Sequence, residues 1–415
     1  MIVIYRLLIN SITLLSPFII LLRLIKKKED LVRFKEKFTF FSKKRRNGNL
    51  VWFHGASVGE MLSIIPLIRK LERKKNINQI LITSSTISSA EIFLKFKFKK
   101  TIHQYFPIDT NSFTKRFLKY WNPNLVVFIE SEIWPNMLTN LKKRSIPHIL
   151  LNARVTKKSF RRWKLLGKFS EKLFCSFNAT YPQNLETERY LKKLKVKKIK
   201  KLGNLKFSHD TFDEENPLKK NLKFFLEKKK YWCAVSTHEG EELICSRIHQ
   251  KLQKKIKNLI TIIIPRHVQR STQIETEINN IGLKTHFHSS QKKINDDTNI
   301  YIVDTYGETK TFFKNSKIVF LGKSLCAEGG QNPLEPARYG CKVLHGPNIS
   351  NFKEIYELLN KKNIAFKVNN QNKLLNKISE LLKKNINIVK NNNKINLIGK
   401  NILKKTFSEL ESLIS

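Results

Sequence analysis

The sequence predicts an α/β protein made of two doubly wound halves, each with a parallel sheet between helices. Three observations predict this fold class. The chain has 415 residues, a length that suits two domains better than one small module. Short apolar runs are each followed by a loop and a helix-length segment, as in βα units. A second series of such units begins after Pro217.

The first element is an apolar amino-terminal segment. No charged residue occurs from Leu7 to Leu22, and a helix of that length spans about 24 Å, less than the ~30 Å hydrocarbon core of a bilayer. Arg6 and Arg23 can extend the apolar stretch by snorkelling. Three lysines, Lys26 to Lys28, follow where a cleaved signal peptide would have small residues. We expect residues 1–25 to be an uncleaved membrane anchor outside the core of either half, with a buried amphipathic helix as the alternative.

The next elements are strands and helices in alternation. Helical periodicity occurs in Met61 to Arg73 and in Phe160 to Phe174. The expected strands are Leu50–His54, Gln79–Thr83, Leu125–Ile129, His148–Asn152, Tyr231–Ser236, Leu259–Pro265, Ile300–Val303, Ile318–Leu321 and Lys342–Leu344. These elements predict one domain over residues 26–206 and a second over 207–415. A stretch from Gly203 to Lys230 is the candidate linker.

The chain is strongly basic. Lys and Arg number 79 and Asp and Glu 33, a formal charge of +46, which requires an anionic partner or reflects a compositional bias toward Lys. The basic stretches are scattered and lack interleaved aromatic residues. Five isolated cysteines form no CxxC pair. We therefore expect no nucleic-acid partner, and a phosphorylated substrate or a membrane surface fits the charge better.

The loop after the first strand holds a candidate base. Glu60 follows Ser57 by three residues, the spacing of a capping box, in which both residues only cap a helix. The functional alternative is that Glu60, at a helix start that favours an anion by about 0.3–1 kcal/mol, stays ionised and accepts a proton from a substrate hydroxyl.

A second loop carries two more acids. Glu130 and Glu132 follow the strand that ends at Ile129, and in extended chain their side chains point to one side. Two acids in one place repel each other unless they are solvated or hydrogen-bonded. A site role and a plain helix start at Pro135 are both open on this pattern.

Four loops of the second half also combine Gly, charged and polar residues. Ser236 and Glu239 again have capping-box spacing, before a helix whose N–H groups can receive a phosphate. The paired glycines Gly329 and Gly330 allow backbone to approach a ligand, and Pro333 suits the first position of a helix. The other two loops contain Pro265-Arg266-His267 and Asp304-Thr305-Tyr306-Gly307-Glu308.

Taken together, these loops resemble the Kdo transferases, which add 3-deoxy-manno-octulosonic acid (Kdo) to the lipid A precursor. The resemblance covers nearly the whole chain and depends on the order and spacing of short blocks. The blocks are Trp52 to Glu60, Phe106 to Asp109, Glu130 to Asn136, Asn152 to Arg154, Gly203 to Phe207, Ser236 to Glu242, Pro265 to His267, Asp304 to Glu308 and Gly329 to Ala337.

The resemblance implies a GT-B fold with two Rossmann-like domains facing a cleft, an amino-terminal anchor in the inner membrane, and an inverting reaction that needs no metal or other cofactor. By the positive-inside rule, Lys26 to Lys28 place both domains on the cytoplasmic side. It implies that Glu60 is the general base and Glu132 a second carboxylate on the acceptor side. The donor would be CMP-Kdo and the acceptor the lipid A precursor, lipid IVA. By position, the CMP-binding residues are Pro265, Arg266, Tyr306, Gly307, Glu308, Asn332, Pro333, Leu334 and Glu335.

The sequence departs from the family pattern at a few of these positions. Tyr306 stands where we expect Met, and Gln269 replaces an acid after His267. The chain has no D-x-D triplet, the usual carboxylate pattern for a sugar-nucleotide metal. Two alternatives remain: another GT-B glycosyltransferase with a different nucleotide sugar, and a membrane-tethered basic binding protein.

Overall fold

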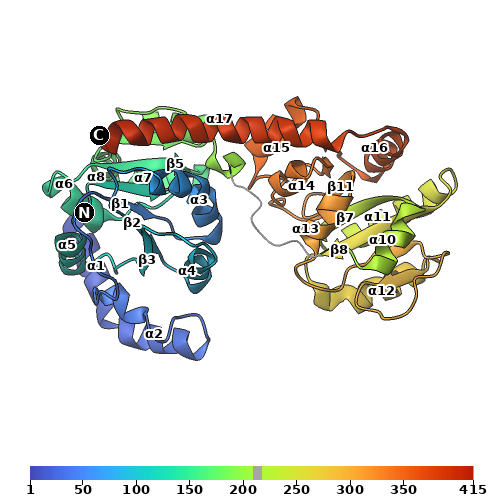
Figure 1. Cartoon of the computed structure of the whole chain (residues 1–415), viewed down its shortest axis with the longest axis horizontal. Coiled ribbons are helices and arrows are strands. Elements are labelled where there is room, and N and C mark those ends of the chain that lie inside the picture. The colour runs from blue at the N-terminus through green and yellow to red at the C-terminus, as the bar shows by residue number, and fades with distance from the viewer. Residues whose placement is uncertain (209–216, 415) are drawn as a thin grey trace. The chain divides into compact units, whose positions relative to one another are not determined.

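The computed structural model describes residues 1–208 and 217–414, and the chain divides into two compact units. The first unit comprises residues 1–210 and 398–415, and the second comprises residues 211–397. Each unit contains one parallel sheet with helices packed against it (Figure 1).

The first unit has a six-stranded sheet in the order β3-β2-β1-β4-β5-β6. Its strands are β1 Leu50–His54, β2 Gln79–Ser84, β3 Thr101–Tyr105, β4 Leu125–Ile129, β5 His148–Ala153 and β6 Ala179–Pro182. Its helices are α3 Val58–Glu72, α4 Ile87–Leu94, α5 Asn111–Trp121, α6 Pro135–Lys143, α7 Lys157–Leu165, α8 Lys168–Phe174 and α9 Leu185–Lys193, with short 3₁₀ turns η1 Phe34–Phe38 and η2 Leu205–Ser208.

Every residue of β1, β2, β4 and β5 is buried, as expected for parallel strands covered by helices on both faces. Trp52, Trp121 and Phe128 fill the layer between the sheet and its helices. The sequence predicts one helix over Phe160 to Phe174, but the structure has two, α7 and α8. The break falls at Gly167, whose φ of +51° suits the left-handed region that glycine tolerates.

The second unit has a seven-stranded sheet in the order β13-β12-β11-β7-β8-β10-β9. Its strands are β7 Lys230–Thr237, β8 Leu259–Pro265, β9 Thr285–Phe287, β10 Ile300–Ile302, β11 Ile318–Leu321, β12 Lys342–His345 and β13 Ala365–Lys367. Its helices are α10 Lys220–Glu227, α11 Glu241–Gln253, α12 Ser271–Asn279, α13 Thr309–Asn315, α14 Leu334–Arg338, α15 Lys353–Lys361, α16 Gln371–Lys383 and the 3₁₀ turn η3 Val268–Arg270.

The last helix, α17 Ile388–Ile414, continues from the second unit into the first. Residues 398–415 therefore belong to the first unit, in place of the predicted single domain over 207–415. Close packing explains this placement: a Cβ on Gly399 would lie 2.2 Å from the carbonyl oxygen of Phe207, so the helix backbone lies against η2. The first boundary, predicted at 206/207, falls at 210/211. Residues 209–216 of the expected linker lie outside the described residues.

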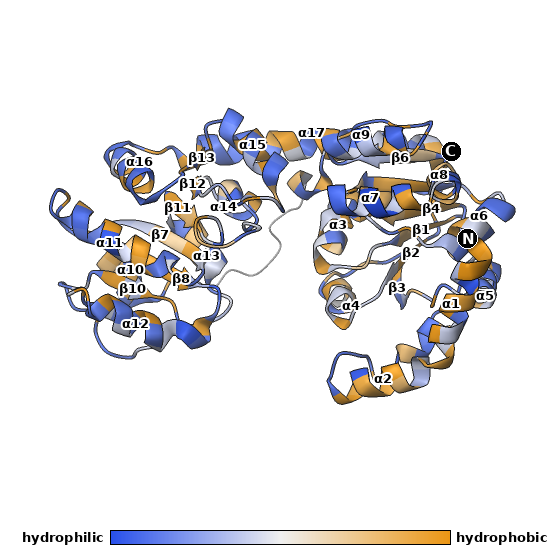
Figure 2. Cartoon of the chain, turned by 180° about the vertical axis from the view of Figure 1, so that it is seen from behind, coloured by the Kyte–Doolittle hydropathy of each residue, from blue (hydrophilic) through white to orange (hydrophobic). Residues whose placement is uncertain are grey.

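The amino-terminal segment forms two helices, α1 Ile2–Leu14 and α2 Ser16–Ile25, in place of one anchor helix. Pro17 lies in the first turn of α2, where proline starts a new helix. Within the described residues, no single helix is long and apolar enough to cross a membrane. The pair meets that criterion together, with a bend of 51° between its members. Figure 2 shows the hydrophobic colouring along both helices.

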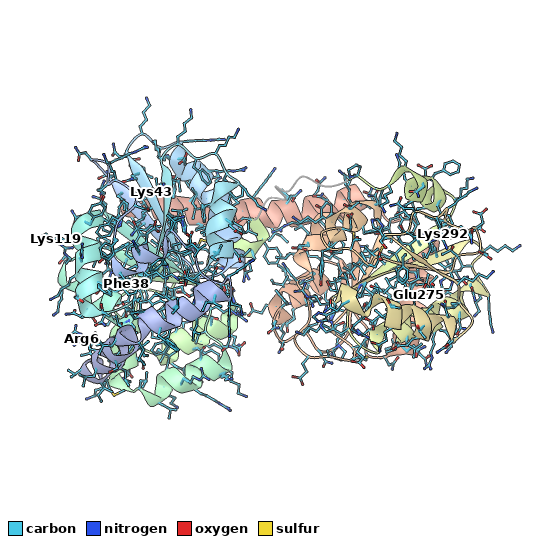
Figure 3. The ribbon with its side chains drawn as sticks, turned by 90° about the horizontal axis from the view of Figure 1, so that it is seen from below. Arg6, Phe38, Lys43, Lys119, Glu275 and Lys292 are labelled. Atoms are coloured by element: carbon cyan, nitrogen blue, oxygen red, sulfur yellow. The ribbon has the colours of Figure 1, made fainter. Side chains whose placement is uncertain are left out.

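The same segment makes polar contacts with the first unit, although α1 contributes no buried residue to the core. The Tyr5 hydroxyl donates to Oδ2 of Asp109 at 2.8 Å, and Nε of Arg6 donates to Oδ1 of Asn136 at 2.9 Å. Arg6 is labelled on α1 in Figure 3. Because Asp109 is buried, these contacts hold α1 against the interior of the unit.

Candidate active site

Three acidic residues of the first unit lie at the carboxyl edge of its sheet. Strands β1 and β4 are neighbours, but the chain continues from them toward opposite edges of the sheet. Ligands of doubly wound proteins bind outside the strand ends at this switch point. Glu60 follows β1, and Glu130 and Glu132 follow β4, so the fold brings the three carboxylates together.

Glu60 lies in the first turn of α3 and is partly exposed. Its Oε2 accepts the backbone N–H of Ala56 at 2.8 Å, and its Oε1 accepts the Ser57 hydroxyl at 2.8 Å. Ser57 is the N-cap and accepts the Glu60 N–H at 3.3 Å. One half of the capping box is thus present, but the carboxylate binds Ala56 and the Ser57 hydroxyl instead of the Ser57 backbone. Gly55 leaves room for this, since a Cβ there would lie 3.2 Å from Oε2.

The electrostatic surroundings of Glu60 suit a proton acceptor. Burial raises its pKa, and the carboxylates of Glu130 and Glu132 raise it further, against the opposing hydrogen bonds from Ser57 and Ala56. The pKa therefore lies above the ordinary glutamate value, although the sequence suggested that the helix dipole would favour the anion. A base is most effective when its pKa approaches the working pH, so the raised pKa strengthens this assignment.

Glu132 has the opposite environment. Its Oε2 lies 3.0 Å from Nε2 of His54 and accepts the indole N–H of Trp134 at 2.8 Å. Burial would raise the pKa of Glu132, but the contacts with His54 and Trp134 outweigh it and leave the pKa below the ordinary value. Neighbouring carboxylates with divergent pKa values have divided roles: Glu132 remains an anion, and Glu60 is the group suited to take up a proton.

His54 is a site residue that sequence analysis recorded only as the end of a strand. It is fully buried, its Nδ1 lies 2.9 Å from the Thr83 hydroxyl, and its ring stacks on Phe106 with centroids 3.8 Å apart. These contacts fix the imidazole that holds Glu132. The signal in the sequence that could have identified His54 as a site residue is that it ends an apolar strand just before a loop that leads to a glutamate.

Glu130 and Glu132 do not share an extended segment, contrary to prediction. Glu130 has a φ of +56° and begins a turn, so its side chain has different partners. Its Oε1 pairs with Nζ of Lys206 at 2.6 Å, and Asn152 donates to the same oxygen at 3.4 Å. Lys206 comes from η2 and was not expected at this site. Glu130 is thereby a paired, buried carboxylate whose charge still acts on Glu60.

The second unit repeats the switch point between β7 and β11. Helix α11 begins at Glu241 after Gly240, and no side chain caps it. The capping box expected from Ser236 and Glu239 is therefore wrong, because Ser236 has a φ of +54° and lies before the helix start. Helix α11 therefore begins without a side-chain cap, and anion binding at its start stays a prediction.

Four loops of the second unit meet at this carboxyl edge. The backbone N–H of Arg266, after β8, donates to the carbonyl of Thr237, at the end of β7, at 3.0 Å. Tyr306, after β10, donates to Oε1 of Gln269 at 3.2 Å, and both of these positions depart from the family pattern. Gly307, with φ +90°, and Glu308 complete that loop before α13. The predicted residues Pro265, Arg266, Tyr306, Gly307 and Glu308 are thus brought together.

The last predicted block lies at the start of α14. Oδ1 of Asn332 accepts the Leu334 N–H at 3.1 Å. Pro333 is the N-cap rather than the first helical residue. Leu334 is fully buried and Glu335 is exposed. Gly330 donates its N–H to the carbonyl of Lys323 at 3.0 Å, which joins this loop to the end of β11.

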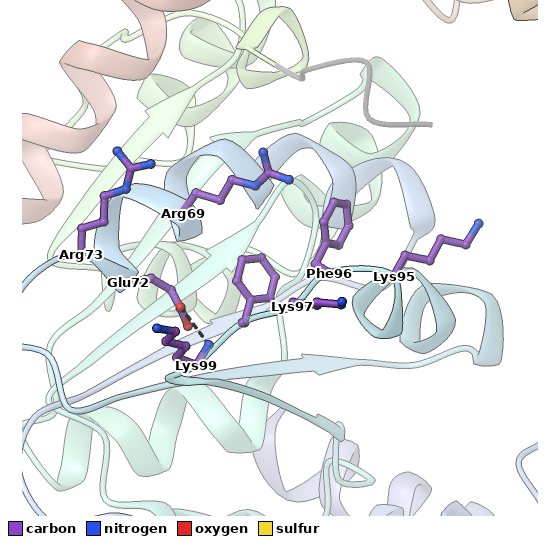
Figure 4. A pocket seen from close by; sticks show the side chains of 8 residues that line it. Arg69, Glu72, Arg73, Lys95, Phe96, Lys97 and Lys99 are labelled. Carbon is purple, nitrogen blue, oxygen red and sulfur yellow. Dashed lines mark hydrogen bonds between the residues drawn. The ribbon is translucent and has the colours of Figure 1, made fainter. Parts of the chain in front are cut away.

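A hollow of about 530 Å³ lies elsewhere on the first unit, lined by residues from the ends of α3 and α4 and the loop before β3 (Figure 4). Glu72 within it accepts the Lys99 N–H at 3.0 Å. This hollow opens at the amino edge of the sheet, away from the candidate site. Among residues 1–208 and 217–414, no group of three or more His, Cys, Asp or Glu side chains is arranged to hold a metal ion.

Comparisons with known proteins find relatives over most of the chain. A family model described as 3-deoxy-D-manno-octulosonic-acid transferase (kdotransferase) matches residues 32–209. The chain is 32% identical over 371 residues to the 3-deoxy-D-manno-octulosonic acid transferase of Rickettsia bellii, and the match covers 88% of this chain and 87% of that protein.

Solved structures match the fold. A UDP-GlcNAc 2-epimerase from Neisseria meningitidis bound to UDP-GlcNAc superposes with a TM-score of 0.57 at 13% identity, covering 88% of this chain and 100% of that one. The glycotransferase of kitacinnamycin gives 0.56 at 9% identity, covering 89% and 100%. These likenesses concern the fold alone, and they confirm the predicted GT-B class of two Rossmann-like α/β units.

Proposed function

The chain belongs to the 3-deoxy-D-manno-octulosonic acid transferase family, and from this premise we propose that it moves Kdo from CMP-Kdo to lipid IVA with inversion at the anomeric carbon. The observation that carries the proposal is the Glu60 carboxylate. It lies at the switch point, partly exposed, with a raised pKa and a fixed orientation.

In the proposed reaction Glu60 takes the proton from the acceptor hydroxyl as its oxygen attacks the anomeric carbon of Kdo. The new bond joins the acceptor oxygen to that carbon, and the bond from the carbon to the phosphate oxygen of CMP breaks. CMP leaves with the electron pair. A single displacement of this kind inverts the configuration. Glu132, kept anionic by His54 and Trp134, serves the acceptor side.

The leaving group needs little help from a protein acid. CMP is a phosphate monoester whose second pKa is about 6, so it departs as an anion. We assign its binding to the exposed Arg266 side chain, the uncapped start of α11, and the loops that carry Tyr306 to Glu308 and Asn332 to Glu335. No step in this scheme uses a metal. Chelator should leave transfer from pre-formed CMP-Kdo unchanged, and a strong, reversible loss would contradict this assignment.

We propose that α1 and α2 hold the enzyme at the inner membrane, where its lipid acceptor resides. The exposed large apolar residues of the pair include Leu7, Leu8, Phe18 and Leu22, and Lys26 to Lys28 follow them toward anionic headgroups. Apolar burial is not screened by salt as surface charge is. The full-length protein should therefore sediment with membranes in high salt. Complete release by salt would contradict this proposal and show that only the basic surface attaches the protein.

The decisive assay incubates the protein with lipid IVA and CMP-Kdo and determines the mass of the lipid product. Each transferred residue adds the mass of one Kdo. Transfer from UDP-sugars instead would support a different GT-B glycosyltransferase. Lipid binding without any change in mass, and unchanged in Glu60→Gln, would identify a membrane-tethered binding protein.

A further inference from the structure

Helix α1 is connected to the candidate site by a chain of hydrogen bonds. Tyr5 donates its hydroxyl hydrogen to Oδ2 of Asp109 at 2.8 Å. One residue on, Nε of Arg6 donates to Oδ1 of Asn136 at 2.9 Å, and Nη2 of Arg6 donates to Oδ1 of Asn111 at 3.2 Å. These partners lie more than 100 positions away in the sequence, so the contacts are tertiary.

Asp109 caps the start of α6. Its side chain is buried, its Oδ2 accepts the backbone N–H of Asn136 at 2.9 Å, and its Oδ1 accepts that of Met137 at 2.9 Å. The Asn136 side chain returns a hydrogen bond to the Asp109 carbonyl at 2.6 Å. These N–H groups have no partner within the helix, and a carboxylate at this end is also favoured by the helix dipole. Asp109 therefore fixes where α6 begins.

The start of α6 determines the place of Glu132. Trp134 is the N-cap of α6, and its indole N–H holds Oε2 of Glu132 at 2.8 Å. Phe106, three residues before Asp109, stacks on His54, the other partner of Glu132, and lies 5.1 Å from the Trp134 ring. Trp134 therefore lies two residues before Asn136, a partner of Arg6. His54 stacks on Phe106, which lies three residues before Asp109, the partner of Tyr5.

We propose that α1 is a positioning element for the reaction: through Tyr5 and Asp109 it sets the place of Glu132. Its other face carries exposed apolar residues, among them Ile4, Leu7 and Leu8. The helix that meets the lipid surface thereby also fixes the acceptor-side carboxylate, which couples membrane attachment to turnover. The inference rests on the proposed function for the role of Glu132.

The test compares two tyrosine variants of the full-length protein. Tyr5→Phe removes a hydroxyl that donates to a carboxylate. Tyr190→Phe on α9 is the matched control, because its hydroxyl also donates to a carboxylate, that of Glu186, at 2.8 Å. Backbone hydrogen exchange over residues 131–138 is measured in both, followed by kcat, the KM for CMP-Kdo and sedimentation with vesicles of anionic phospholipid.

We expect Tyr5→Phe to lose exchange protection over 131–138 and to lower kcat about tenfold, since small misplacements of catalytic groups have effects of this order. KM for CMP-Kdo and sedimentation should stay at parent values. In a Glu132→Gln background, Tyr5→Phe should lower kcat no further. Tyr190→Phe should match the parent throughout.

Unchanged exchange over 131–138 in Tyr5→Phe would overturn the inference, and this readout needs no substrate. A parent kcat in Tyr5→Phe, or a loss that persists undiminished in the Glu132→Gln background, would overturn it as well. Failure of the proposed function is separate, because it would appear as absence of Kdo transfer by the parent protein while the exchange result still stands.

Discussion

The two sheets place a glutamate at the same point of the fold and use it in different ways. Glu60 lies in the first turn of α3, which follows the first strand of the first sheet. Glu241 lies in the first turn of α11, which follows the first strand of the second sheet. Glu60 is partly exposed, whereas Glu241 is fully buried.

The partners of the two carboxylates explain the difference. Glu241 accepts backbone N–H groups from both sides: His238 at 3.0 Å and Lys323 at 2.7 Å on Oε2, and Ser324 and Leu325 at 3.0 Å on Oε1. It clamps the loop after β11 onto α11. The hydrogen bonds of the Glu60 carboxylate, within the described residues, come from its own loop at Ala56 and Ser57. Each carboxylate oxygen of Glu60 thus accepts one hydrogen bond, whereas each oxygen of Glu241 accepts at least two backbone N–H groups.

Glycines control how closely each carboxylate is approached. A Cβ on Gly322, just after β11, would lie 2.5 Å from the carbonyl oxygen of Ser236 and 2.7 Å from Oε2 of Glu241. The loop after β11 therefore approaches the end of β7 with no side chain between the two backbones. In the first unit the corresponding loop after β4 is held by side chains, through the Glu130–Lys206 pair and the Glu132–His54 contact.

The largest expected effect is that of Glu60→Gln. The amide keeps the length of the side chain and can still accept the Ala56 hydrogen bond, but it has no useful proton affinity. Turnover should fall by ~10²–10⁴-fold, while CMP binding and the melting temperature stay close to the parent. Glu91→Gln, at an exposed position of α4, is the control. Near-normal turnover in Glu60→Gln would remove the base assignment and shift it to Glu132.

The pH dependence of turnover tests the environment of Glu60. Burial and the neighbouring carboxylates raise its pKa above 4.5, and the base acts in its ionised form. Turnover should therefore decline on acidification from a pH above 4.5, by about tenfold for each pH unit below the pKa. Rates measured from pH 4 to 8, with stability checked at each pH, should show this decline in turnover at acidic pH (the acid limb) for the parent and not for the residual activity of Glu60→Gln. A limb that persists there assigns the titration to another group.

Glu241→Gln should affect stability before chemistry. Its amide nitrogen would face backbone N–H donors, and each buried donor left unpaired costs about 1–3 kcal/mol. The free energy of unfolding, measured by denaturant titration, should fall by roughly 2–5 kcal/mol, with weaker CMP binding. Glu239→Gln, on the same loop but exposed, should leave both unchanged. Parent-like stability in Glu241→Gln would show that the clamp is dispensable.

The smallest effect is expected for Ser57→Ala. The change removes the N-cap acceptor of α3 and costs about 1 kcal/mol of stability. It also removes one hydrogen bond to the Glu60 carboxylate, so the acid limb should move to higher pH. Turnover at neutral pH should fall far less than in Glu60→Gln. A comparable loss in the two variants would place the chemistry on the hydroxyl rather than on the carboxylate.

The central strands of both sheets could be predicted from the sequence, and the four edge strands could not. The strands that sequence analysis missed are β3, β6, β9 and β13, which occupy the outer positions of the two sheets. Central parallel strands are buried on both faces and appear as continuous apolar runs. Edge strands have one neighbour and are short and more polar, as in Thr285–Phe287 and Ala365–Lys367, so their residues carry little strand signal.

The site divides in the same way. Glu60 and Glu132 follow closely after apolar strands, and sequence reasoning reached both. The partners that set their properties come from distant segments: His54 for Glu132, Lys206 for Glu130, and Tyr5 with Asp109 for the start of α6.

By itself, the sequence determined the parallel α/β class, the order of the units and the polar loops that follow the strands, because periodicity and the residues after a strand are local properties. Only the tertiary structure decided which carboxylate is available and which is occupied, and that the end of α17 belongs to the first unit. Burial, like-charge repulsion and backbone approach depend on residues far apart in the chain, so no local pattern records them.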